Sequence, residues 1–195
     1  MATYKTITGP AEASFTEKRS RFLAFAFPVS TPEEARLIVK EFAKKFYDAR
    51  HVCFAYMLGA DRQQFLANDN GEPSGTAGRP ILGQIHSLEL TDVIVLVVRY
   101  FGGIKLGTPG LIAAYKESAR LVLEAADIVE RRQMHRFTVR FPYMAINDIM
   151  KAVKHSDITV VDRQFDNTCS ITVEVPADMA QALRDRMLSV SGATE

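Results

Sequence analysis

The sequence has little cysteine, no tryptophan and no long apolar run. Cys53 and Cys169 are the only cysteines in 195 residues, which is too few for a disulfide framework and does not support a thiolate metal site. The longest apolar run, Val93–Val98, is far too short to cross a bilayer, and the first 15 residues lack the basic start and apolar stretch of a signal peptide. We therefore expect a cytoplasmic protein without a membrane partner.

An excess of one charge is also absent. The 24 Lys and Arg residues nearly balance the 23 Asp and Glu residues, which leaves a formal net charge of +1. Composition thus gives no general sign of a nucleic-acid, membrane or acidic partner, and any basic site must be a local patch. With 47% apolar and 24% charged residues, the chain is typical of one or two folded globular domains.

The hydrophobic pattern predicts an α+β protein with two domains. In the first domain it predicts strands over 21–29, 51–58 and 91–100, amphipathic helices over 31–46 and 109–126, and a polar, glycine-rich loop between the second and third strands. From about Met134 the predicted order is strand 136–141, helix 144–155, strands 158–165 and 169–175, and helix 177–189. That order is typical of a ferredoxin-like α/β sandwich with a short or missing last strand. We place the domains at 1–132 and 133–195.

Glycine is concentrated in one region of the first domain. Eight of the 11 glycines lie between Gly71 and Gly110, and the spacing G-x-x-x-G-T-x-G occurs at 71–78 and again at 103–110. Glycine permits positive φ and a close approach of backbone N–H groups to a ligand, and a helix that starts nearby adds unpaired N–H donors. Tight turns and close helix packing would explain these glycines equally well.

Cations occur in the same region. The chain has no Asp or Glu between Asp92 and Glu117, although it has three Lys or Arg residues there. We therefore expect a site for phosphate, nucleic acid or a partner protein, built from Arg21, Arg79, Arg99, Lys105, Thr108 and Lys116. The aromatic rings of Tyr100 and Phe101 could stack a base. The specific nucleotide motifs G-x-x-x-x-G-K-[ST] and G-x-G-x-x-G are absent, so no cofactor, metal or catalytic residue is assigned.

Two alternatives stay open. Asp69 and Glu72 would serve as acid and base, or as cation ligands, in an enzyme that acts on a phosphorylated or nucleotide substrate, although a solvated turn explains them as well. Cys53 in an apolar strand and four histidines without metal-ligand spacing give nucleophilic or metal catalysis little support. The other alternative is a protein-interaction scaffold, which would expose a large apolar patch.

Two long motifs are similar to a known family. DNGEPSGTAGRPIL at 69–82 and VVRYFGGIKLGTPGLIAAY at 97–115 resemble the signature of the IMPACT family, and the segments 18–24 and 49–56 match its flanks. The whole chain resembles the bacterial YigZ-type members. The loop residues of the motif are Asp69, Gly71, Glu72, Gly75, Thr76, Gly78, Gly102, Gly103, Gly107 and Gly110. Where the family usually has Gly-Gly before the helix, this chain has Pro109-Gly110, which removes one backbone donor.

The resemblance implies a fold and a role. It implies a first domain of the β-α-β type shared with RNase PH and a small-subunit ribosomal protein, and a second, ferredoxin-like domain similar to the last domain of elongation factor G. Eukaryotic relatives regulate translation under amino-acid starvation by binding a partner of the stress kinase. We therefore expect a non-enzymatic binding protein of translation that contacts RNA, the ribosome or a translation-factor protein.

Overall fold

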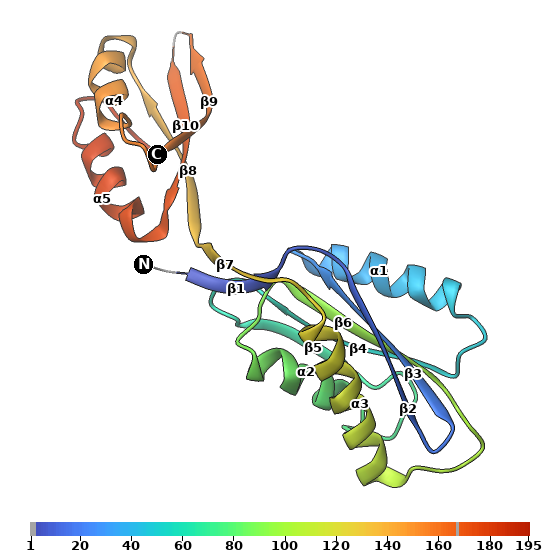
Figure 1. The fold of residues 1–195 in the computed structure, drawn as a ribbon. Helices are drawn as coiled ribbons and strands as arrows, with labels where there is room; N and C mark the ends of the chain where they lie inside the picture. The colour runs from blue at the N-terminus through green and yellow to red at the C-terminus, as the bar shows by residue number, and fades with distance from the viewer. Residues whose placement is uncertain (1–2, 167) are drawn as a thin grey trace. The chain divides into compact units, whose positions relative to one another are not determined.

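The protein forms two compact units, each with its own hydrophobic core. The computed structural model describes residues 3–166 and 168–195 and has the predicted α+β composition (Figure 1). One unit is Tyr4–Arg131, and the other contains Arg132–Glu195. Among the described residues, no helix is both long enough and apolar enough to cross a membrane.

A five-stranded antiparallel sheet forms the centre of the first unit. Its strand order is β2-β3-β6-β4-β5, and the strands are β2 (Ala11–Glu17), β3 (Ser20–Pro28), β4 (His51–Leu58), β5 (Gln64–Asn68) and β6 (Val93–Tyr100). Because β3 and β4 are both antiparallel to β6, they run parallel to each other with β6 between them. The predicted β-α-β element is therefore present in split form. The likeness to RNase PH stays a prediction.

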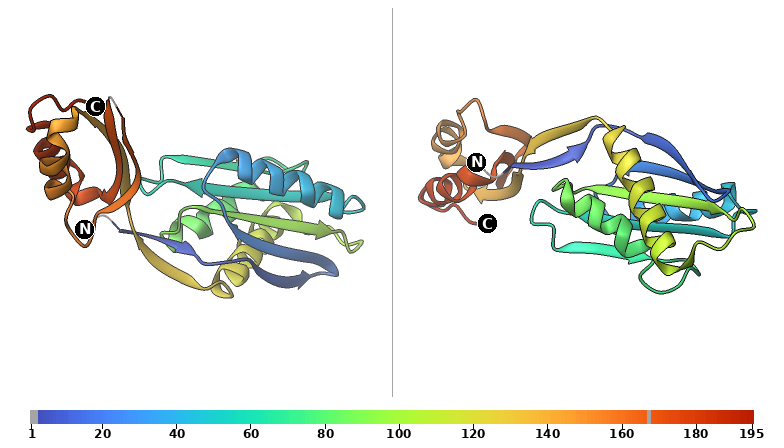
Figure 2. Two further views of the ribbon diagram at one scale, coloured as in Figure 1. Left: turned by 90° about the horizontal axis from the view of Figure 1, so that it is seen from above. Right: turned by 60° about the horizontal axis from the view of Figure 1, so that its bottom comes forward.

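Helices cover both faces of this sheet. Helix α1 (Pro32–Lys45) packs on one face, and α2 (Gly78–Ser87) and α3 (Gly107–Glu124) pack on the other, as the right view of Figure 2 shows for α3. The even-numbered residues of β6 from 94 to 98 face α1, whereas Val93, Val95 and Val97 face α2 and α3. Because side chains alternate along a strand, Arg99 falls on the α3 face.

The start of α1 follows the predicted pattern. The Thr31 hydroxyl accepts the Glu34 N–H at 3.2 Å, and the Glu34 carboxylate accepts the Ser30 N–H at 2.7 Å. These reciprocal bonds satisfy N–H groups that the first helical turn cannot pair. Pro32 occupies the first turn, where its missing N–H costs nothing.

The prediction of a loop between the second and third strands is wrong. This segment contains the edge strand β5 and the helix α2. Helix α2 has the sequence GRPILGQIHS, in which two glycines and a proline lower the local helix propensity. Burial of Ile81 and Ile85 and a carboxylate at the N-terminus stabilise α2 instead. The short strands β1 (Thr3–Ile7) and β7 (Ile128–Arg132), which pair as a separate ribbon, were also not predicted.

The second unit has the predicted order of elements. Its antiparallel sheet has the order β8-β10-β9, formed by β8 (Met134–Phe141), β9 (Thr159–Phe165) and β10 (Cys169–Pro176). The helices are a 3-10 turn η1 (Tyr143–Ala145) that leads into α4 (Ile146–Ala152), and α5 (Ala177–Leu188). At the position expected for a last strand lies an isolated bridge, in which Arg140 and Thr194 exchange backbone hydrogen bonds of 2.8 and 2.9 Å.

Candidate functional site

A buried ion pair lies where β6 ends. Arg99 donates from Nη1 to Glu72 Oε1 at 2.7 Å, and the two side chains are only 8% and 3% exposed. The Arg99 guanidinium also lies 5.7 Å from the centroid of the Phe22 ring and 5.6 Å from that of the Phe101 ring. Its Nε atom is buried and has no hydrogen-bond partner among the described residues. The two charges compensate each other. Either charge alone would destabilise the fold, because a buried charge without a partner has lost its hydration.

Tyr115 and Cys53 extend this cluster below the carboxylate. The Tyr115 hydroxyl donates to Glu72 Oε1 at 2.8 Å, and the Cys53 thiol donates to the Asp69 carbonyl at 2.9 Å. Burial, together with the neighbouring Cys53 and Glu72, raises the pKa of Tyr115 far above its usual value. Burial also raises the pKa of Cys53 to about 12, despite the opposing hydrogen bond to Tyr115. Cys53 is therefore a neutral thiol and unsuited to act as a nucleophile.

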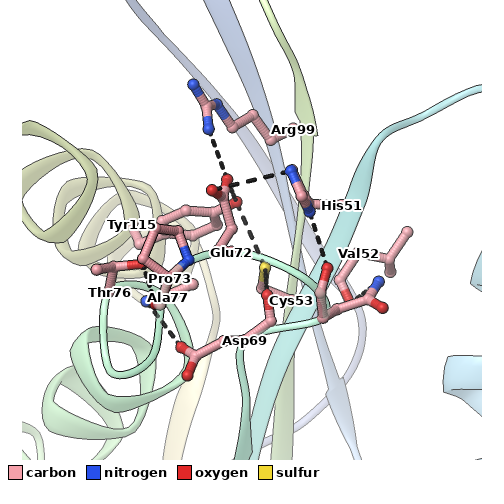
Figure 3. Close-up of polar contacts among 11 residues, drawn as sticks. His51, Val52, Cys53, Asp69, Glu72, Pro73, Thr76, Ala77, Arg99 and Tyr115 are labelled. Carbon is pink, nitrogen blue, oxygen red and sulfur yellow. Dashed lines mark hydrogen bonds and ion pairs between the residues drawn. The ribbon is translucent and has the colours of Figure 1, made fainter. Parts of the chain in front are cut away.

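His51 contributes its ring from the neighbouring strand. It lies opposite Arg99 in the β4–β6 register, and its Nδ1 atom is 2.8 Å from the Asn70 carbonyl oxygen (Figure 3). Its Nε2 atom is 3.8 Å from Glu72 Oε2, which is beyond hydrogen-bond distance. Gly71 packs beside the ring, since a Cβ atom there would lie 3.4 Å from Nδ1, and its φ of +83° also favours glycine.

Asp69 points away from this cluster, to the N-terminus of α2. Its carboxylate accepts three backbone N–H groups, from Gly75 at 2.8 Å, Ala77 at 3.0 Å and Gly78 at 2.8 Å. Partial burial raises the pKa of Asp69, but these three hydrogen bonds lower it more, and the result is below its usual value. The carboxylate is thus occupied in holding the loop to the helix.

A cleft of about 460 Å³ opens above the Arg99–Glu72 pair. Its floor includes His51, and its wall includes the first residues of α3 together with Lys105, while Arg50 and Phe101 also contribute. The N-cap residue of α3, Leu106, makes no side-chain cap hydrogen bond, and no other side chain in the described part of the chain takes its place. Within residues 3–166 and 168–195, neither Arg50 nor Lys105 takes part in an ion pair, so their charges are not balanced locally.

The structure brings together only some of the predicted residues. The cleft is lined by Gly71, Glu72, Arg99, Lys105, Gly107 and Thr108. Arg21, Arg79 and Lys116 are exposed but do not line it, and Arg21 instead lies 6.0 Å from the Tyr100 ring. Arg99 is less available to a ligand than expected, because its charge is already paired.

Other motif residues have structural roles. The hydroxyl of Thr76 donates to the Pro73 carbonyl at 2.6 Å. A Cβ atom on Gly102 would lie 2.0 Å from the backbone of Arg19, so only glycine fits this close approach. The enzyme alternative needed both Asp69 and Glu72 at one cleft with the cations, and the structure places only Glu72 there. No group of three or more His, Cys, Asp and Glu among the described residues is arranged to hold a metal ion.

Sequence reasoning missed His51, Tyr115 and Arg50 as members of the site. The available signal for His51 was its i, i+2 relation to Cys53, which puts both side chains on one face of β4. The strand register that sets His51 beside Arg99 could not be read from the chain.

The fold and the cleft define a class: a two-unit α+β protein with a cation-lined cleft at the start of a helix. The sequence model of the Impact N-terminal domain matches residues 18–123, a range that contains every residue of the cleft. The chain belongs to the IMPACT family, as its two glycine motifs predicted.

Similar proteins extend this likeness over most of the chain. IMPACT family member YvyE of Bacillus subtilis is 32% identical over 188 residues, which is 96% of this chain and 87% of that protein. IMPACT family member YigZ of Escherichia coli is 32% identical over 162 residues, or 82% and 79% of the two chains. A crystal structure of a hypothetical protein matches with a TM-score of 0.78 and 27% identity, and covers 100% of this chain and 96% of that one.

Proposed function

We propose that this protein is a non-enzymatic binding protein of translation that binds RNA, with a phosphate group in the cleft. The carrying observation is that, among the described residues, the N-terminus of α3 without a side-chain cap and two cations without an ion pair line one cleft. Helix N-termini and cations are the groups that hold phosphate in proteins.

The charges in the cleft favour an anion. Glu72 balances Arg99, so the floor is close to neutral, and the net positive charge comes from Arg50 and Lys105 at the margin. The Gly107 N–H and the Thr108 hydroxyl would donate to phosphate oxygens, whereas Pro109 has no N–H to offer. The cleft volume of about 460 Å³ is also within the usual range for small ligands, about 300–1,000 Å³.

The link to translation is supported by the family. Membership is shown over 18–123, and the family resemblance implies that eukaryotic relatives regulate translation. In the second unit, the order β8-α4-β9-β10-α5 and the sheet order β8-β10-β9 agree with a ferredoxin-like domain that keeps only a bridge in place of its last strand. Such domains and the split β-α-β unit are compatible with an RNA-binding role.

The test measures binding of a short single-stranded RNA across a salt series, with Lys105→Ala beside Lys116→Ala. Both lysines are exposed, but only Lys105 lines the cleft, so Lys116→Ala is a matched control for loss of one charge. We expect Lys105→Ala to weaken binding several-fold and to reduce the slope of log K against log salt by about 1. Lys116→Ala should leave both quantities close to those of the unmodified protein.

Two results would contradict the proposal. Binding that does not depend on salt would show that phosphate contacts are not involved. Equal losses of RNA affinity in the two variants would show that binding depends on the total positive charge and not on the cleft. Arg99→Ala is a poor test because it leaves the buried Glu72 carboxylate without its cation and destabilises the fold. If RNA does not bind but ribosomal or translation-factor proteins do, the partner is a protein.

A further inference from the structure

The floor of the cleft offers hydrogen-bond acceptors beside the cations. A carbonyl oxygen can only accept, so the 2.8 Å contact with the Asn70 carbonyl requires the proton of His51 to be on Nδ1. In the neutral ring the Nε2 atom then carries a lone pair. The Nε2 atom is 3.8 Å from Glu72 Oε2, too far for a hydrogen bond, so no hydrogen bond to this carboxylate occupies it. The geometry therefore fits Nε2 as an acceptor.

Glu72 provides a second acceptor next to it. Its Oε1 atom already accepts from Arg99 and Tyr115, whereas its Oε2 atom accepts no hydrogen bond from the described residues. Figure 3 shows the His51 ring directed toward this carboxylate. The two side chains are 12% and 3% exposed, so a ligand that covers these acceptors must bring a donor to replace water.

We infer that His51 Nε2, with Glu72 Oε2 beside it, accepts a hydrogen bond from the ribose 2′-hydroxyl of the nucleotide whose phosphate lies at Lys105 and α3. This inference rests on the proposed function and makes the cleft selective for RNA over DNA. A ligand that joins a phosphate to a neighbouring hydroxyl donor matches a cleft with cations at the margin and acceptors at the floor. The 2′-hydroxyl is also the group by which proteins distinguish RNA from DNA.

The ring of His51 is held firmly enough to make this selection. It is 12% exposed, it is fixed at Nδ1 by the Asn70 carbonyl, and it packs beside Gly71. An acceptor in a fixed position discriminates better than one on a mobile side chain, because little conformational entropy is lost when the ligand binds. A sugar without a 2′-hydroxyl binds more weakly, because it displaces water from both acceptors and brings no donor to replace it.

The test compares three oligouridylates of equal length that differ only at the 2′ position: hydroxyl, fluorine or hydrogen. The base is uracil in all three oligomers, so any hydrogen bond from its N3–H contributes equally and does not affect the comparison. The 2′-fluoro sugar keeps the ribose-like pucker but cannot donate. We expect the 2′-hydroxyl oligomer to bind about tenfold more tightly than both others, because one hydrogen bond contributes a difference in affinity of about this size. A 2′-fluoro oligomer that binds as tightly as RNA would overturn the inference.

A protein variant locates the effect. His51→Phe keeps a ring of similar size but has no acceptor, so it should remove most of the difference in affinity between the 2′-hydroxyl and 2′-deoxy oligomers. Lys116→Ala should preserve the difference between them. Equal, salt-dependent binding of all three oligomers to the unmodified protein would overturn the inference but support the proposed function. Absence of salt-dependent binding to any oligomer would contradict the proposed function itself.

Discussion

The two copies of G-x-x-x-G-T-x-G in the first unit share a positive φ at each of their first two glycines. The first glycine of each copy, Gly71 or Gly103, has a φ of +83° or +86°, and the second, Gly75 or Gly107, has a φ of +78° or +72°. Each copy leads into a helix, α2 or α3. The likeness is confined to these two glycines, because α2 begins at the third glycine of its copy, Gly78, and α3 at the second, Gly107.

The copies differ in what occupies the start of the helix. Two residues before the first glycine, the first copy has Asp69 and the second has Phe101. The Asp69 carboxylate caps α2, while α3 has no side-chain cap and opens onto the cleft. In the same way Thr76 donates to a carbonyl of its own loop, while Thr108 lines the cleft. One internal carboxylate therefore separates a structural loop from a candidate binding loop.

The largest expected effect is at the third glycine of each copy. A Cβ atom on Gly78 would lie 2.5 Å from the backbone nitrogen of Asn68, so Gly78→Ala must move the main chain. A Cβ atom on Gly110 would lie 3.0 Å from Leu106 Cβ, a less severe contact within one helix turn, and alanine also has the higher helix propensity there. We expect Gly78→Ala to lower the free energy of unfolding by about 3 kcal/mol, and Gly110→Ala by well under half as much. Denaturant unfolding would measure this, and equal losses would contradict the structural account.

Removal of the cap from the first copy should have the next largest effect. We expect Asp69→Ala to lower the free energy of unfolding by about 2 kcal/mol, because three N–H groups lose their acceptor. Asp69→Asn keeps one oxygen acceptor and should lose less. A loss below a few tenths of a kcal/mol would show that water replaces the carboxylate.

The same residue should also show in the pH dependence of stability. The pKa of Asp69 is lowered in the folded state, so its contribution is complete above the unfolded pKa of about 3.9 and is lost as the pH falls through the folded value. Below about pH 4 the unmodified protein should therefore lose stability more steeply than Asp69→Asn. Parallel curves for the two proteins would contradict the lowered pKa.

The smallest effect is expected for a substitution that gives the second copy the carboxylate of the first. Phe101→Asp would place a carboxylate two residues before the first glycine of the second copy, as Asp69 is in the first, and so near the start of α3. We expect it to weaken RNA binding about tenfold, or about 1.4 kcal/mol, because the helix start is then occupied by an internal anion. Phe101→Asn removes the same ring without adding a charge, and the difference between the two variants isolates the carboxylate.

The parts of the fold that could be predicted are those where local pattern and burial agree. The continuous β-branched run of β6 and the capped, amphipathic α1 are of this kind. Helix α2 was missed because its stability comes from Asp69 and from two buried isoleucines, and not from its own residue preferences. The antiparallel insertion of β6 between β3 and β4 depends on long-range pairing, which local pattern does not contain.

For the cleft, composition indicated the region but not the pairing. Arg99, Lys105 and Thr108 were predicted from the acid-free, glycine-rich stretch, and all three line the cleft. Their separate roles could not be predicted, because Glu72 comes from a loop distant in sequence and neutralises Arg99. Whether these residues bind a ligand stays a prediction.

The placement of the two cysteines has a consequence for following the molecule in solution. Cys53 is buried in the first unit and Cys169 in the second, so each unit encloses a single thiol. A thiol reagent can reach either one only when the unit around it opens. The rates at which the two thiols are labelled therefore report the opening of each unit separately. The protein thus carries its own internal probe of whether a ligand in the cleft closes the first unit alone or also stabilises the second.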